Sequence, residues 1–268
     1  MIRFDRFPGG TCFALTLSYD DGRDHDRRLV EIMNKYGIKG SFHLNSSRIG
    51  AVENCVTPEE MPELYKNHEI SCHGVYHYSV NTLPPQNVIL ELLEDRKALE
   101  NIAGYPVRGM SYANGGYSDE AISALKNCGI VYSRTTAATH GFGIPEDFMK
   151  WHPTCHHRDC IEDGKRFLAA IERGYVPFLR VFYVWGHSYE FANENNWELI
   201  EEFCKMMSGN DKIWYATNIE IYEYIMAQKA LIISADNTIV RNPTDITVWF
   251  SKKGVTYSVK PGETIKID

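Results

Sequence analysis

The sequence predicts an α/β barrel followed by a small antiparallel β appendage. Strand-like and helical segments alternate along residues 13–229, and repeated β-α units imply parallel strands. Several Asp and His residues fall at or just after the expected strand ends, where a closed β/α barrel carries its active site. After residue 230 the pattern changes to short apolar runs. We therefore divide the chain into a barrel, residues 1–230, and an appendage, residues 231–268.

The first part of the barrel is expected to hold three strands, each followed by a helix. In chain order these are a buried strand at 13–19, a helix at 24–36 closed by Gly37, a strand at 40–45, a short helix started by the capping box Thr57-Pro58-Glu59-Glu60, a strand at 69–73 and a helix at 86–103.

The second part continues the alternation and brings the expected strands to seven. It contains a strand at 107–112, a helix at 118–128, a strand at 130–134, an irregular stretch, a helix at 164–173, a strand at 177–185, a helix at 194–207, a strand at 213–217 and a helix that ends at Lys229.

The end of the chain predicts a small β module. Short runs at 231–233, 238–240, 246–250, 255–259 and 264–267 are separated by turn signals such as Asn242-Pro243 and Pro261-Gly262. Trp249 could bind carbohydrate, but we expect it to pack or to make a subunit contact, because a solitary strand aromatic is ordinarily core. These strands are our candidate for an oligomer contact.

Composition and charge limit the classes of function. The chain has 268 residues, of which 44% are hydrophobic, and a net charge of −7. It can therefore bury a barrel-sized core. The negative charge and the scarcity of Lys/Arg clusters argue against nucleic acid or an anionic membrane surface as a partner.

Two further features bear on location. No apolar run reaches the length of a membrane span, and the first residues lack the apolar core of a signal peptide. The seven cysteines form an odd set without regular spacing, which is typical of reduced thiols. If the chain starts at its native N-terminus, we expect a cytoplasmic protein without a membrane partner.

Two motifs supply ligand types for a divalent metal. Asp20 and Asp21 lie in Leu17-Ser18-Tyr19-Asp20-Asp21-Gly22, and His73 and His77 lie in His73-Gly74-Val75-Tyr76-His77. Zn²⁺ takes imidazole nitrogen and carboxylate oxygen, and a catalytic site uses three such protein ligands. We expect the adjacent carboxylates to point in different directions, so we assign Asp21 to the metal and Asp20 to proton transfer. Spacing alone leaves their order open.

Each motif taken alone has a plainer interpretation. An Asp-Asp-Gly after an apolar strand is usually a turn with solvated carboxylates, and two histidines four apart occur by chance in many chains. Their combination with two further segments favours the functional interpretation. These segments are Tyr105-Pro106-Val107-Arg108-Gly109-Met110-Ser111-Tyr112 and Tyr183-Val184-Trp185-Gly186-His187-Ser188.

With these segments the chain resembles the polysaccharide deacetylase family, carbohydrate esterase family 4. Its first motif, Thr-Phe-Asp-Asp-Gly, is matched by Ser18-Tyr19-Asp20-Asp21-Gly22, and its second, His-(Ser/Thr)-x-x-His, by residues 73–77. The resemblance implies a distorted (β/α)7 barrel, with which the count of expected strands agrees. Later motifs depart from the family: Gly109-Met110 follows Arg108 where Arg-x-Pro is usual, and Val184-Trp185-Gly186 precedes His187 where Leu-x-Ile is usual.

The resemblance also implies residue roles. Asp21, His73 and His77 would hold one divalent metal, most readily Zn²⁺, with Co²⁺ or Ni²⁺ as alternatives. Asp20 would act as base, Arg108 would pair with Asp20, and His187 would give a proton to the leaving group. The backbone amide of Tyr112 would stabilise the oxyanion, and Trp151, Trp185 and Tyr189 would form sugar-stacking walls. A surface ion pair for Arg108 and core packing for Trp185 stay open.

One rival metal segment is Cys155-His156-His157-Arg158-Asp159-Cys160. It is rich in ligand types, but it lacks the two separated knuckles that structural zinc generally uses. We expect a loop that lines the cleft instead.

Three classes of function follow. The leading one is a metal-dependent deacetylase, a hydrolase of non-peptide carbon–nitrogen bonds, that acts on an N-acetylated sugar or short oligosaccharide, with O-acetyl removal as a close variant. The second keeps the fold but cleaves a non-sugar amide or other C–N bond of a small substrate. The third is a non-catalytic carbohydrate-binding protein, against which the presence of all the charged residues argues.

Overall fold

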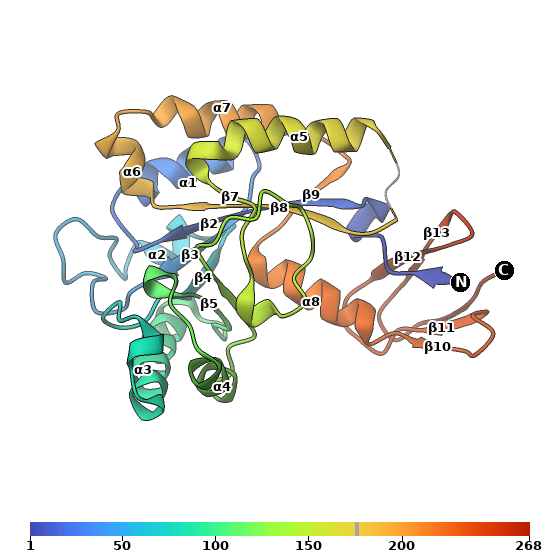
Figure 1. The fold of residues 1–268 in the computed structure, drawn as a ribbon, viewed down its shortest axis with the longest axis horizontal. Helices are drawn as coiled ribbons and strands as arrows, with labels where there is room; N and C mark the ends of the chain where they lie inside the picture. Colours follow the sequence, from blue (N-terminus) through green and yellow to red (C-terminus); the bar gives the residue numbers. More distant parts are fainter. Residues whose placement is uncertain (175–176) are drawn as a thin grey trace.

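A curled parallel β-sheet forms the centre of the molecule (Figure 1). The computed structural model describes residues 1–174 and 177–268. The strands of this sheet are β2 (Phe13–Asp20), β3 (Gly40–Leu44), β4 (Glu69–Cys72), β5 (Gly109–Ser111), β6 (Tyr132–Arg134), β7 (Cys155–His156), β8 (Arg180–Gly186) and β9 (Ile213–Tyr215). Seven strands follow the order β6-β5-β4-β3-β2-β8-β7, and β9 also pairs with β2. All these pairs are parallel, which confirms the predicted α/β barrel in its distorted form.

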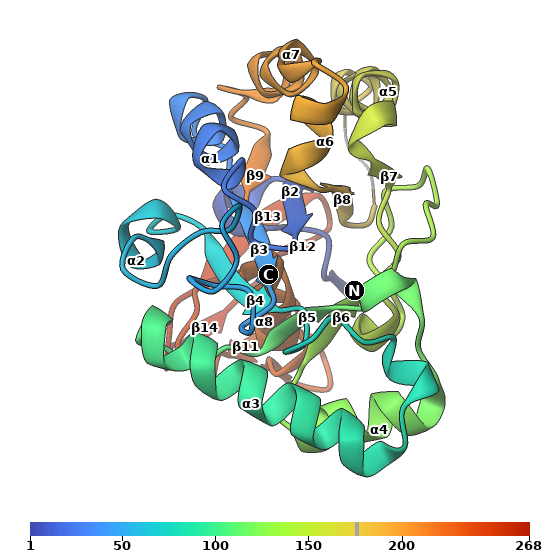
Figure 2. The same cartoon turned by 90° about the vertical axis from the view of Figure 1, so that its left-hand side faces the viewer.

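Helices cover the outside of the sheet. They are α1 (Asp26–Lys35), α2 (Met61–Leu64), α3 (Pro85–Ala103), α4 (Asp119–Asn127), α5 (Cys160–Glu172), α6 (Ser188–Asn193), α7 (Trp197–Met207) and α8 (Asn218–Lys229). In Figure 2, α1, α5, α6 and α7 lie on one side of the sheet, and α3 and α4 lie on the opposite side. The start of α8 is fixed by a capping box, in which the Thr217 and Glu220 side chains accept each other's backbone N–H.

The gap between β6 and β8 is bridged by the segment that leads into β7. Trp151 donates its backbone N–H to Ser133 of β6 at 3.0 Å, and Thr154 donates to Tyr183 of β8 at 2.8 Å. This segment was expected to be irregular, and neither β7 nor α6 was predicted. Elements of two and six residues carry too little periodicity to be recognised.

The appendage consists of two antiparallel three-stranded sheets. Their strands are β1 (Ile2–Arg3), β10 (Ile232–Ile233), β11 (Ile239–Arg241), β12 (Val248–Lys252), β13 (Val255–Val259) and β14 (Thr264–Lys266). The orders are β1-β12-β13 and β10-β11-β14. The start of the chain therefore joins the appendage through β1, whereas the expected division gave residues 1–230 to the barrel. Trp249 lies against α8, where its backbone N–H donates to Tyr224 Oη at 2.9 Å.

Two general features of the described residues complete the fold. None of their helices is long and apolar enough to span a membrane. All seven cysteines are buried, and none of them forms a disulfide bond with another described residue.

A buried polar network fills part of the barrel interior beneath β5. Glu69 accepts hydrogen bonds from the hydroxyl groups of Ser41 at 2.6 Å, Tyr132 at 2.6 Å and Ser71 at 3.1 Å. Burial raises the pKa of Glu69, and these donors oppose the increase. Gly109 of β5 packs directly on this network, because a Cβ there would overlap the hydroxyl groups of Tyr132 and Ser71.

Replacing Gly109 by alanine should destabilise the barrel. The added methyl group would force the network or the backbone of β5 to move, so we expect the free energy of unfolding to fall by about 1–3 kcal/mol in urea denaturation. Gly143→Ala is the matched control, since no atom lies within 4 Å of its added carbon. Equal losses in the two variants would contradict the packing explanation.

Candidate active site

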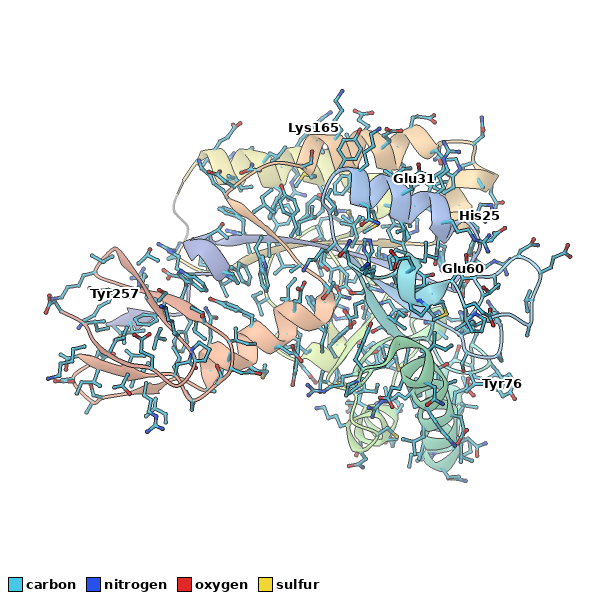
Figure 3. The ribbon with its side chains drawn as sticks, turned by 180° about the vertical axis from the view of Figure 1, so that it is seen from behind. His25, Glu31, Glu60, Tyr76, Lys165 and Tyr257 are labelled. Carbon is cyan, nitrogen blue, oxygen red and sulfur yellow. The ribbon has the colours of Figure 1, made fainter. Side chains whose placement is uncertain are left out.

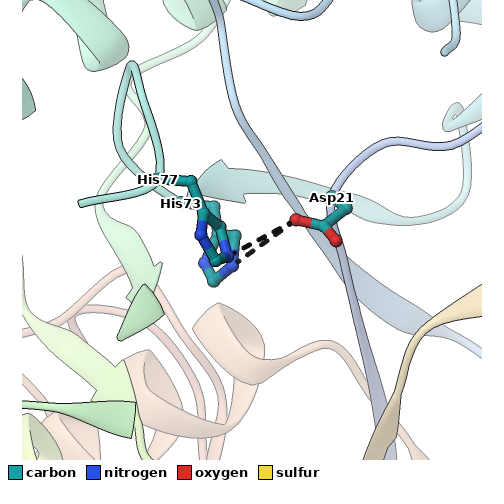
Figure 4. Close-up of side chains that lie close together, drawn as sticks. All are labelled: Asp21, His73 and His77. Atoms are coloured by element: carbon teal, nitrogen blue, oxygen red, sulfur yellow. Dashed lines mark ion pairs between the residues drawn. The ribbon is translucent and has the colours of Figure 1, made fainter. Parts of the chain in front are cut away.

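Asp21, His73 and His77 lie together at the carboxyl ends of β2 and β4 (Figure 4). His77 Nε2 lies 3.6 Å from Asp21 Oδ1, and His73 Nε2 lies 3.9 Å from the same oxygen. The His73 side chain is buried, whereas 11% of the Asp21 side chain and 22% of the His77 side chain are exposed to solvent. The structure thus brings together the three side chains that the sequence selected as metal ligands.

The backbone at two of these residues adopts an unusual conformation. Asp21 has a φ of 81° and His77 a φ of 62°, in the left-handed region that non-glycine residues rarely occupy. Such strain is common at functional sites. Asp20 Oδ2 and Asp21 Oδ1 lie 3.8 and 3.9 Å from His73 Nε2. Only Asp21 belongs to the group of ligand atoms that lie within 4.8 Å of one another, whereas Asp20 pairs with Arg134.

Helix α3 holds the loop that carries the two histidines. Asp95 Oδ2 accepts the backbone N–H groups of His73 at 3.1 Å and Gly74 at 2.9 Å, and Glu91 Oε1 accepts that of Tyr76 at 2.7 Å. Burial raises the pKa of Asp95 to about 6, and the amide donors oppose the increase. Gly74 has a φ of 82° and a Cβ there would approach Glu91, so the loop requires glycine at this position.

Ser111, at the end of β5, orients both His73 and Asp20. Its hydroxyl group donates to Asp20 Oδ1 at 3.0 Å, and its Oγ and carbonyl oxygen lie 2.7 and 3.0 Å from His73 Nδ1. Because the hydroxyl proton is directed to Asp20, the Nδ1–H of His73 donates to Ser111. The Nε2 lone pair then faces Asp21, as a metal-binding imidazole requires. Burial lowers the pKa of His73 and favours this neutral form.

Asp20 forms a buried ion pair with Arg134, the last residue of β6. Burial alone would raise the pKa of Asp20, but the Arg134 guanidinium and the nearby imidazoles outweigh it and hold the pKa well below its usual range. Asp20 is therefore ionised. Arg48 reaches Asp21 rather than Asp20, at 3.3 Å, from the solvent side.

The expected pairing of Arg108 with Asp20 is wrong. Arg108 precedes β5 and lies 3.4 Å from Glu223 of α8, and 40% of its side chain is exposed. Arg134 takes the expected place beside Asp20. A signal for it was present in the sequence, because Arg134 ends its predicted strand whereas Arg108 stands early in its own strand.

His187 follows β8 and contacts Glu190 of α6. Its Nδ1 lies 3.1 Å from Glu190 Oε1, so that carboxylate orients the ring. Burial would lower the pKa of His187, but the hydrogen bond to Glu190 and the charge of Asp20 raise it above its usual value. Glu190 was not selected from the sequence, although its position three residues after His187 at a helix start was a usable signal.

Three of the four residues chosen for the substrate walls and the oxyanion, Tyr112, Trp151 and Trp185, lie in different surroundings. Trp185 is half-buried and its ring lies 4.4 Å from the Arg134 guanidinium, beside the site. Trp151 is 1% exposed and packs in the core against Tyr183, so it cannot stack on a sugar. Tyr112 is fully buried, and its backbone N–H already donates to the Arg134 carbonyl at 3.0 Å, which excludes the expected oxyanion contact.

Comparison with known proteins gives a family match and a set of similar folds. Residues 9–133, which include Asp20, Asp21, His73 and His77, match the family model of polysaccharide deacetylases. No curated protein sequence matches the chain.

Three solved structures share the fold at low identity. A Mycobacterium smegmatis protein assigned to the polysaccharide deacetylases is 17% identical, with a TM-score of 0.63 over 85% of this chain and 94% of that chain. A mutant of the Bacillus subtilis peptidoglycan deacetylase PdaC is 17% identical, with a TM-score of 0.51 over 82% and 93%. A family 4 acetyl xylan esterase from Clostridium thermocellum, in complex with a cobalt ion, is 14% identical, with a TM-score of 0.51 over 78% and 90%.

The chain spans 55% of the length of another matching structure, the Streptococcus pyogenes deacetylase PplD. The family match covers the segment that carries both motifs of the candidate site, and the fold agrees with it. Over residues 9–133, which make up less than half of its length, the chain is similar to the polysaccharide deacetylase family.

Proposed function

We propose that this protein is a metal-dependent hydrolase that removes acetyl groups from an N-acetylated or O-acetylated sugar or short oligosaccharide. The observation that carries the proposal is the convergence of Asp21, His73 and His77 beside an ionised Asp20. The family match over residues 9–133 supports deacetylation as the reaction, and the charged groups of the site favour catalysis over mere carbohydrate binding.

The three side chains suit a divalent ion. Two ligands bound to one tetrahedral ion lie about 3.4 Å apart, given metal–ligand bonds of about 2.1 Å. The nitrogen–oxygen distances of 3.6 and 3.9 Å from Asp21 to the two histidines are close to this spacing. When bound, such an ion supplies Lewis-acid polarisation of the acetyl carbonyl and lowers the pKa of water. Zn²⁺ matches the donor set best, and Co²⁺ and Ni²⁺ are alternatives.

Two residues near the metal ligands carry out the two proton transfers. Asp20 accepts a proton from the attacking water, because Arg134 keeps it ionised and Ser111 orients it. His187 donates a proton to the leaving amine or alcohol, since contact with Glu190 favours its protonated form. Arg134 acts as a positioning residue through Asp20.

A groove beside the ligand loop supports a carbohydrate substrate. It has a volume of about 690 Å³ and is lined by Val75, Tyr76 and Tyr78 together with the exposed side of α3. Tyr76 and Tyr78 are 63% and 52% exposed, and their ring centroids lie 5.8 Å apart. Figure 3 shows Tyr76 at the end of the molecule away from Tyr257 of the appendage. Exposed rings of this kind offer apolar faces to a sugar.

The proposed reaction is tested by acetate release from the protein loaded separately with Zn²⁺, Co²⁺ or Ni²⁺. We expect acetate from N-acetylglucosamine oligomers or acetylated xylan, and loss of release on chelation. Asp20→Asn should lower kcat by about 10²–10⁴-fold, because the base is lost, while bound metal per chain stays unchanged. Full activity in Asp20→Asn or after chelation would overturn the mechanism, and release from non-sugar acetamides alone would overturn the substrate class.

Arg134 and Arg108 should differ sharply in their effect on turnover. Arg134→Met removes the partner of Asp20 while it keeps most of the side-chain volume, so we expect kcat to fall at least 10-fold with little change in KM or bound metal. Arg108→Met is the matched control and should change kcat less than 2-fold, because its partner Glu223 lies outside the site. Equal effects of the two substitutions on kcat would refute the role of Arg134.

Tyr76→Ala should weaken oligosaccharide binding. Loss of one stacking face of about 0.5–1.5 kcal/mol predicts a KM about 2–10-fold higher for an oligomer, with kcat unchanged. A monosaccharide substrate should show no such change if only the longer substrate reaches the groove. Phe4→Ala, which removes another exposed aromatic side chain, serves as the control. An unchanged KM for the oligomer would exclude the groove.

A further inference from the structure

A second group of potential metal ligands lies beside Trp185, whose ring centroid is 4.9 Å from that of His156. His156 and His157 come from the end of β7 and the turn after it, and Glu190 comes from α6. We infer that these three residues form a second divalent-cation site, separate from Asp21, His73 and His77. The inference goes beyond the proposed function and does not depend on it.

The ligand atoms converge on one point. His156 Nε2 lies 2.9 Å and His157 Nε2 lies 3.0 Å from the same oxygen, Glu190 Oε2. All three atoms lie within 4.8 Å of one another. Two histidines and one glutamate are a known ligand set of zinc sites that keep an open position.

The two short approaches lack the geometry of regular hydrogen bonds. Glu190 Oε2 is buried, yet no donor among the described residues reaches it with acceptable hydrogen-bond geometry. A carboxylate oxygen and two nitrogens that face a common point have the arrangement of ligands around an ion.

The cluster is held rigidly by its surroundings. His157 is 1% exposed, its ring lies 4.2 Å from that of Phe191, and it packs against Gly186, where a Cβ would overlap Nδ1. The ligands therefore require little rearrangement to bind an ion.

The cysteines of the same segment are not part of the site. Cys155 and Cys160 are fully buried, and burial raises the pKa of both thiols, which keeps them protonated. The imidazoles of the segment, and not its thiols, face Glu190.

Arg158 sets a condition on metal uptake. Its Nε and its backbone N–H donate to His156 Nδ1 at 3.1 and 3.4 Å, which favours the tautomer that carries the proton on Nε2. Binding through Nε2 must move that proton to Nδ1 and displace both donors, of which the exposed side chain makes the shorter contact. Removal of the Arg158 side chain leaves only the longer contact and should therefore tighten the second site.

The test is the number of Co²⁺ ions bound per chain, measured by elemental analysis and by Co²⁺ absorption after dialysis. We expect two in the native protein, one in His73→Ala, one in His156→Ala and none in the double variant. His140→Ala is the matched control, because it removes an exposed imidazole that pairs with Asp163, and it should keep two. Arg158→Ala in the His73→Ala background should lower the Kd of the remaining ion.

The outcomes separate this inference from the proposed function. An ion that survives His73→Ala and is lost with His156→Ala supports the second site, even if the first site binds nothing. Glu190→Gln, which keeps the side-chain shape, must abolish the same ion if His156→Ala is poorly folded. Loss of all metal in His73→Ala, or an ion in that background indifferent to His156→Ala and Glu190→Gln, would show that the cluster is an imidazole–carboxylate network without metal.

Discussion

The buried ion pair between Asp20 and Arg134 is the constraint on which the site depends. Both side chains are almost fully removed from water, and an unpaired charge at such a depth costs several kcal/mol. The pair joins the end of β2 to the end of β6, and Ser111 ties the end of β5 to the same carboxylate. The curled sheet brings these three strand ends to one edge. Asp20 stays ionised only because the fold places Arg134 beside it, and the ion pair in turn holds the strand ends together. Asp21 is thereby left with an oxygen directed at the histidines.

The strands and the ligand triad could be predicted from local pattern. Long buried runs such as β2 and amphipathic helices such as α1 have a clear period, and the motifs that hold Asp21, His73 and His77 are short and contiguous. The left-handed backbone at Asp21 could not be predicted, because it depends on the contact of its N–H with His43 of the neighbouring strand. Likewise β1 forms only against β12, a partner almost the whole chain away.

The remaining parts of the site depend on contacts between distant segments. Arg108 and Arg134 are both arginines near strands, and apart from their positions within those strands it is the placement of β6 beside β5 that brings Arg134 to Asp20. Tyr112 and Trp151 have residue types suited to substrate contact, yet the bridge between β6 and the segment before β7 buries both. Glu190 contacts two histidines on another segment, His156 and His157, in addition to His187 three residues before it. Composition and spacing do not report such neighbours.

Helix α3 supports the ligand loop with its buried face and lines the groove with its exposed face. Its buried stripe, Val88, Glu91, Leu92, Asp95 and Leu99, packs inward and holds the loop of His73 and His77, whereas Asn87, Leu90, Glu94 and Ala98 line the groove beside Tyr76. Substitutions on the outer stripe can reshape the groove without moving the carboxylates that fix the loop. Related chains can therefore vary in the substrates that they accept while they keep one arrangement of metal ligands. Glu91 both holds the loop and lines the groove, so a substitution there affects both.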